Sequence, residues 1–191
     1  MFATVTDIEE AAIFDFPPGG EDDKEQPLAV AQAAISQATI VPRSRLEPEL
    51  IQEKRRKVIK SIASKLNVSL VQKSRALFWD PTHQTRVACA ISKVYANAGH
   101  EGFWYAYHPQ WAEYLAQGRT GLFVLGCMNV DEAYAIPRVR ISAILPRLHT
   151  TTRNGSTYWH IRLQKTASGM VMLIPRQVPL PLQEFSLPLD R

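Results

Sequence analysis

Residues 102–137, GFWYAYHPQWAEYLAQGRTGLFVLGCMNVDEAYAIP, decide the fold, because they predict a strand, a helix and two further strands in succession. In the first strand, over 102–108, aromatic residues occupy one face, namely Phe103, Tyr105 and Tyr107. The other face holds Trp104, Ala106 and His108. Both faces are apolar or aromatic for most of their length, so we expect a strand covered on both sides and interior to its sheet.

The helix predicted over 109–118 begins at Pro109, where a missing N–H costs least, and ends at Gly118. Its buried stripe is predicted by spacings of three and four residues, at Trp111, Tyr114 and Leu115. Residues 122–125 predict a fully buried strand, 129–131 a turn, and 134–136 a returning strand.

The net charge of +4 conceals an asymmetry along the chain. Residues 1–50 contain three basic and ten acidic residues (net −7), whereas residues 51–191 contain 19 basic and eight acidic ones (net +11). A strongly basic domain attracts polyanions, and nucleic acid is the commonest of them. The alternative is a basic domain whose charge only keeps it in solution.

The composition points to a cytoplasmic protein with no membrane segment. No apolar run approaches the roughly 20 residues of a membrane span, and the acidic N-terminus does not fit a signal peptide. Cys89 and Cys127 both lie in apolar runs, as buried thiols of a reducing compartment do.

Three regions are expected: a disordered acidic arm (1–43), a single basic α+β domain (44–175) and a Pro-rich extended tail (176–191). Within the arm, residues 8–16 mix acids with Ile and Phe, so they suit a short motif that folds onto a protein partner; the tail is a second candidate for such docking. Alternatively, the acids only solubilise a basic protein, or the arm competes with nucleic acid for the basic surface.

The domain is expected to begin with a helix over 47–66, preceded by the capping box Ser44-Arg45-Leu46-Glu47. The predicted buried stripe is Ile51, Val58, Ile59, Ile62 and Leu66. The rest of its surface is expected to carry cations, namely Lys54, Arg55, Arg56, Lys57, Lys60 and Lys65. Such a run is either a solvated face or a set of phosphate contacts.

The other predicted elements are a mixture of strands and one more helix. Extended segments are expected over 69–72 and 75–79, a turn over 80–83, and strands over 86–95, 157–164 and 170–174. A helix is expected over 139–148, bent or ended by Pro146. Residues 149–156 are expected to form a loop with a turn at Asn154-Gly155. The fold class is therefore α+β, a mixed β-sheet with flanking helices.

This order of elements resembles the αβββαβ core of the restriction-endonuclease-like PD-(D/E)XK superfamily, over about half of the chain. The resemblance implies a Mg²⁺ site in which Asp80 and Glu101 are the carboxylates and Lys93 steadies the attacking water. The acid-x-Lys position falls on Ile91-Ser92-Lys93, where the lysine is present and the acid is absent. The resemblance therefore implies a degenerate nuclease scaffold that binds DNA without cutting it. It also suggests small domains associated with bacterial restriction and phage defence.

The leading hypothesis is a DNA-binding domain with no cofactor. Its predicted interface is Lys54, Arg55, Lys57, Lys60, Arg138, Arg140, Arg147, Thr151, Thr152, Arg153, Asn154, His160 and Arg162. The alternatives are a divergent Mg²⁺-dependent nuclease and a protein-interaction subunit of a larger nucleic-acid-processing complex. Two assignments remain open: the histidines and tryptophans are either structural or sites of catalysis and base stacking, and Lys93 lies either at a strand end or in a site.

Overall fold

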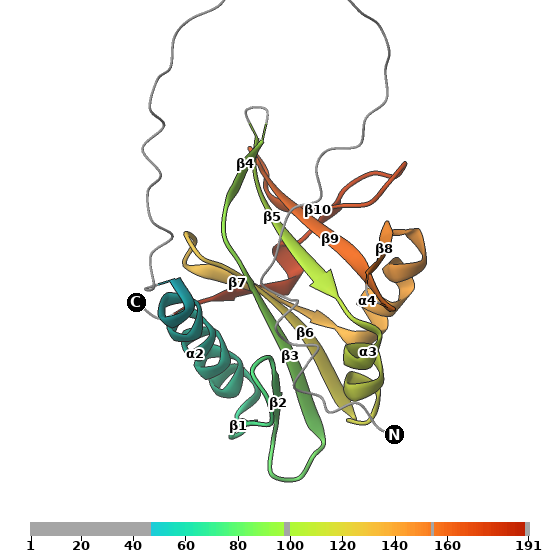
Figure 1. Cartoon of the computed structure of the whole chain (residues 1–191). Coiled ribbons are helices and arrows are strands. Elements are labelled where there is room, and N and C mark those ends of the chain that lie inside the picture. The colour runs from blue at the N-terminus through green and yellow to red at the C-terminus, as the bar shows by residue number, and fades with distance from the viewer. Residues whose placement is uncertain (1–46, 98–99, 154, 190–191) are drawn as a thin grey trace, which may run out of the picture.

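The computed structural model describes residues 47–97, 100–153 and 155–189 (Figure 1). The predicted arm, with its 8–16 motif, lies outside these residues, as does Asn154. The helical elements are α2 (Glu47–Leu66), α3 (Pro109–Ala116), α4 (Arg138–Ile144), η2 (Leu145–Arg147) and η3 (Gln183–Phe185). Together with strands in two sheets, they confirm the α+β class.

Sheet A contains six strands in the order β1-β2-β3-β6-β7-β12. These strands are β1 (Val71–Gln72), β2 (Leu77–Trp79), β3 (Thr85–Ser92), β6 (Thr120–Cys127), β7 (Glu132–Pro137) and β12 (Ser186–Pro188). β3 and β6 run parallel and their neighbours run antiparallel, so the sheet is mixed as predicted.

Sheet B follows the order β11-β10-β9-β5-β4, with β8 also paired to β9. Its strands are β4 (Tyr95–Asn97), β5 (His100–Tyr107), β8 (Thr150–Arg153), β9 (Ser156–Thr166), β10 (Gly169–Leu173) and β11 (Leu180–Pro181). Of these strands the sequence predicted β5, β9 and β10, but it did not predict the division into two sheets. The chain crosses from sheet A to sheet B between Ser92 and Tyr95.

Helix α2 covers the outward face of sheet A (Figure 1). The predicted stripe is buried except at Leu66, which is half-buried; Val58 and Ile62 are fully buried and pack on β-strand residues such as Val87 and Val124. The expectation that all its cations lie outward is wrong for Lys54 and Arg55, which are buried. Their long side chains cross the apolar stripe and donate to the backbone oxygens of Val130 and Cys89.

The main core lies between the two sheets, where α3 and α4 also pack. β5 contributes Phe103, Tyr105 and Tyr107, and β6 contributes Phe123 and Leu125. The predicted alternation of β5 and the inward stripe of α3 are therefore confirmed. Both cysteines are buried free thiols, also as predicted.

Two segments differ from expectation. Residues 150–153, expected in a loop, form β8, because the chain turns at Gly155 (φ +74°) and they pair with β9 as a hairpin. The Pro-rich tail, expected only to be extended, also pairs with both sheets, through β11 on β10 and β12 on β7. Four of its apolar residues are buried in the cores, which fixes it: Leu182, Phe185, Leu187 and Leu189.

β5 was expected to be interior to its sheet and to have both faces covered, and each expectation is only partly correct. β9 pairs with it over Gly102–Tyr107, whereas β4 reaches only to Gly102. The helices pack on sheet A and on one another, so Trp104 on the outward face of β5 is only half-buried. An indole tolerates this position because its ring is apolar and its N–H is polar.

Candidate functional site

The outward face of sheet B, called the outer face below, carries half-exposed aromatic side chains beside a cation: Trp104, Tyr158, His160 and Arg162. The strand register places Trp104 opposite Arg162 and Ala106 opposite His160. The rings are in mutual contact, with centroids 6.2 Å apart for Trp104 and Tyr158 and 5.2 Å for Tyr158 and His160. The predicted alternation of β9 is thus confirmed, since Ile161 and Leu163 point into the core.

His160 is held between two hydrogen bonds on this face. The Trp104 indole N–H donates to its Nδ1 at 3.1 Å, and its Nε2 lies 2.7 Å from the Thr151 hydroxyl. Because Nδ1 accepts, the neutral ring carries its proton on Nε2 and donates to Thr151. Burial, then the nearby His149 and Arg162, lower the pKa of His160. His160 is therefore a neutral residue that fixes the Trp104 ring.

Four of the predicted β8–β9 residues lie on this one face, namely Thr151, Arg153, His160 and Arg162. The Thr151 hydroxyl contacts His160. Arg153, two residues along β8, lies on the same face as Thr151 and is exposed. Thr152 points to the opposite face, where its hydroxyl contacts Thr157 at 2.8 Å. The outer face thus combines aromatic rings, hydroxyls and guanidinium groups.

The other predicted cations lie elsewhere. Lys57 and Lys60 are exposed on α2, beyond sheet A from the outer face. Arg138, Arg140 and Arg147 belong to the α4–η2 segment, which packs on β6 and β7. The predicted continuous basic face of α2, α4 and 149–156 is therefore not formed, because sheet A separates its two ends.

Two of the α4–η2 arginines contact the C-terminal tail. Arg140 forms an ion pair of 3.0 Å with Glu184, and its guanidinium lies over the Phe185 ring. Arg147 donates to the Gln177 side chain at 3.1 Å. Both contacts are exposed, so they contribute little stability, yet they give these arginines partners within the chain.

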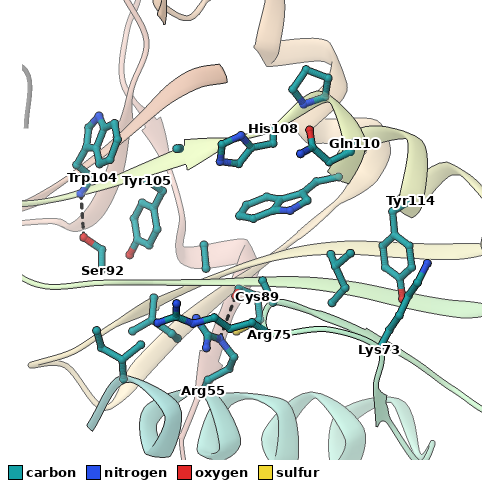
Figure 2. A pocket seen from close by; sticks show the side chains of 18 of the residues that line it. Arg55, Lys73, Arg75, Cys89, Ser92, Trp104, Tyr105, His108, Gln110 and Tyr114 are labelled. Carbon is teal, nitrogen blue, oxygen red and sulfur yellow. Dashed lines mark hydrogen bonds between the residues drawn. The ribbon is translucent and has the colours of Figure 1, made fainter. Parts of the chain in front are cut away.

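A cleft of about 480 Å³ opens around the end of β5 that β4 does not reach (Figure 2). The backbone N–H of Trp104 donates across it to the Ser92 hydroxyl at 3.1 Å, so it points away from β9. Ala106, two residues along, turns its N–H and C=O the same way. Among the described strands, none pairs with this part of β5.

The cleft walls are aromatic and cationic. The aromatic lining residues are Tyr95, Trp104, Tyr105, Trp111 and Tyr114. The basic ones are Arg55, Lys73, Arg75 and Lys93, against a single carboxylate from Glu113. The Tyr105 and Tyr114 hydroxyls donate to the backbone oxygens of Gly126 and Phe78. Their hydrogen bonds are thus made to the protein.

His108 lies in the wall of this cleft, directly before α3 (Figure 2). It is 4% exposed, and neither ring nitrogen has a hydrogen-bond partner among the described residues. Its ring contacts Trp111 and Tyr158, at centroid distances of 5.1 and 5.8 Å. Burial lowers its pKa, so at neutral pH it offers one N–H donor and one nitrogen acceptor.

Two of the residues implied by the nuclease resemblance, Asp80 and Lys93, do not come together. Asp80 accepts hydrogen bonds from the Thr82 backbone and side chain and from the Thr85 N–H, and these bonds lower its pKa. Asp80 precedes β3 and Lys93 follows it, which separates them by roughly 23 Å at about 3.3 Å per residue. The Glu101 side chain lies outside the described residues.

Asp80 and Lys93 therefore do not contribute to one shared Mg²⁺ site. Within residues 47–97, 100–153 and 155–189, no group of three or more His, Cys, Asp or Glu side chains is close enough to hold a metal ion. Asp80 fixes the turn between β2 and β3, where His83 adopts a positive φ of +60°. Its role is structural.

Sequence reasoning missed the cleft as a site. Lys73, Arg75 and Ser92 were not singled out as site residues, since they lie in segments that are separated along the chain and meet only in the folded protein. The available signal was His108, a polar residue at the end of an otherwise aromatic strand.

No protein-family model, curated protein or solved structure matches this chain. In the part of the chain that the structure describes, no helix has the length and apolar character needed to cross a membrane.

Proposed function

We propose that this protein binds single-stranded nucleic acid without cleaving it, through the outer face of sheet B. The observation that carries the proposal is the half-exposed pair Trp104 and Tyr158 beside Arg162. Bases of a single strand stack on aromatic rings of a sheet, while cations at the side hold the phosphates. The charge of +11 over residues 51–191 supports the same partner.

A single strand is proposed instead of a duplex because of how the cations are distributed. Reading a duplex requires a continuous basic surface around an element that enters a groove. The α2 cations lie beyond sheet A from Arg153 and Arg162, so they cannot contact the same stretch of duplex from one side. DNA remains the proposed partner, and the cytoplasm remains the proposed compartment. Binding of RNA is measured as the alternative.

The test is fluorescence anisotropy with labelled single-stranded DNA, single-stranded RNA and duplex DNA across a salt series. We expect a single strand to bind more tightly than the duplex, and affinity to fall steeply as salt rises. Arg162→Glu should weaken binding at least about tenfold and reduce the salt dependence, because a phosphate contact is lost.

Lys60→Glu is the matched control, since it makes the same charge change at an exposed position on α2. It should leave the affinity within about twofold of wild type, because only screened long-range attraction changes. Equal loss in both variants, or tighter binding of the duplex, would overturn the outer face as the site. A denaturing gel, run after incubation of the strand with the protein and Mg²⁺, tests whether the strand is still intact. A cut strand would refute binding without cleavage.

A further inference from the structure

We propose that the cleft beside β5 binds one nucleotide, a planar nitrogen heterocycle carrying a phosphate, either free or as a residue of the bound strand. The strand alternative rests on the proposed function, whereas the free nucleotide does not. The volume of about 480 Å³ lies within the range of small-molecule sites, about 300–1,000 Å³.

The first argument is the polar edge that the cleft presents. His108 supplies one donor and one acceptor that are buried without a partner among the described residues. Burying such a group costs free energy unless a ligand or water completes its hydrogen bonds. The N–H and C=O of Ala106 add a second donor and acceptor on the same strand. A base edge carries donors and acceptors in one plane, which matches this pairing.

The second argument is the composition of the walls. Tyr95 and Trp104, which are half-buried in the walls, supply apolar ring surface for a flat heterocycle. Cations reach the cleft from three separate segments: Arg55 from α2, Lys73 and Arg75 from the β1–β2 connection, and Lys93 from the end of β3. Against them stands one carboxylate, that of Glu113, so the cleft favours an anion. The ligand therefore combines an aromatic base with a phosphate.

The third argument is that the cleft and the outer face adjoin. The ring of Tyr158, on the outer face, lies 5.8 Å from the ring of His108, which lines the cleft. Trp104 belongs to both regions. Its indole N–H donates to His160 on the outer face, and Trp104 also lines the cleft. A nucleotide in the cleft can therefore belong to a strand that lies on the outer face.

The experiment titrates the full-length protein with the four common nucleoside 5′-monophosphates and the matching nucleosides, by isothermal titration calorimetry. We expect at least one monophosphate to bind, and its nucleoside to bind at least about tenfold more weakly, because the charge-assisted contacts between the phosphate and the cations are then lost. Absence of binding by all four monophosphates at millimolar concentration would overturn the proposal.

His108→Phe tests the polar edge. This change keeps the ring contacts with Trp111 and Tyr158 but removes both nitrogens, so the protein should melt at or above the wild-type temperature. Monophosphate affinity should fall at least about tenfold, as hydrogen bonds of the ligand are left unmade. A variant that is folded and binds as tightly as wild type would refute the assignment.

Charge reversal tests the cation wall with an internal control. Lys73 is exposed, with its ammonium 5.0 Å from the centre of the Tyr114 ring, so Lys73→Glu should fold normally and bind the monophosphate several-fold more weakly. Lys60→Glu on α2 lies away from the cleft lining and should leave this affinity unchanged. Equal affinities in both variants would contradict an anionic ligand.

Competition distinguishes the two sources of the nucleotide. Displacement of the monophosphate by a single-stranded oligonucleotide supports a nucleotide of the strand, while binding without displacement supports a free nucleotide. Arg162→Glu distinguishes the cleft from the outer face. This variant should lower the affinity for the oligonucleotide and leave the affinity for the monophosphate unchanged. Monophosphate binding that persists without any oligonucleotide binding would refute the proposed function alone.

Discussion

The outward faces of sheets A and B are built by the same alternation of side chains, but only the first is covered by a helix. On sheet A, the outward residues Val87, Cys89 and Val124 are fully buried beneath α2. On sheet B, the corresponding positions hold Trp104 and Tyr158, which remain half-exposed. An uncovered sheet face need not be apolar, and aromatic residues with polar groups suit it.

The comparison separates stability from binding. A covered face stabilises the fold in proportion to the apolar area that it removes from water. The outer face instead holds its rings with side-chain hydrogen bonds, through His160 and Thr151. Substitutions should therefore affect unfolding most beneath α2, and ligand affinity most on sheet B.

The largest expected effect is that of Ile62→Ala beneath α2. Ile62 is fully buried, so removing three carbons should lower the free energy of unfolding by about 3 kcal/mol. Arg162→Ala on the outer face is the matched comparison and should change it by less than about 0.5 kcal/mol. Urea denaturation monitored by circular dichroism measures both. Similar losses would show that the two faces contribute equally to stability.

A smaller effect on the free energy of unfolding is expected from a change in pH. It arises from two histidines, His108 and His160. Burial lowers the pKa of both His108 and His160 in the folded protein. Below about pH 6.5 the unfolded chain therefore binds more protons than the folded one. The stability that these neutral rings provide is complete above that pH and is lost as the pH falls below it.

Denaturation at several pH values between about 5 and 8 tests this expectation, since histidine titrates in that range. His108→Phe should flatten part of the slope because one of the two shifted groups is removed, whereas Ile62→Ala should lower the whole curve without changing its shape. An unchanged slope in His108→Phe would contradict the lowered pKa of His108.

The sequence predicted local elements better than their assembly. The spacing of apolar residues located α2, α3 and the alternation of β5 and β9, because these depend on neighbours within a few residues. The predicted capping box lies mostly outside the described residues. The division into two sheets depends on how the chain turns between Ser92 and Tyr95, where no local signal stands out. The tail was underestimated because its prolines interrupt any period, although its leucines reach both cores.

The candidate site shows the same limit in physical terms. The side chains of β8 and β9 were predicted together because they are close in sequence and meet across one hairpin. Lys54 and Arg55 were misplaced because composition cannot show that a long side chain crosses an apolar stripe to a backbone oxygen. Asp80 was assigned to chemistry, although its spacing from Thr82 and Thr85 also fits a turn.

The smallest expected effect separates the two roles of the outer face. Thr151→Val keeps the side-chain volume but removes the hydroxyl that contacts His160 Nε2, leaving the ring held only by the Trp104 indole. The loss of one half-exposed hydrogen bond should lower the free energy of unfolding by about 1 kcal/mol or less, since water can replace the hydroxyl.

Oligonucleotide affinity should fall more than stability does, because a loosened His160 no longer fixes the Trp104 ring on which a base stacks. Thr152→Val, one residue along β8 on the opposite face, is the matched control and should leave affinity unchanged. If Thr151→Val and Thr152→Val weakened binding equally, the outer face would not be the surface that contacts the strand. A loss confined to Thr151→Val would connect the hydrogen bonds beneath Trp104 to recognition.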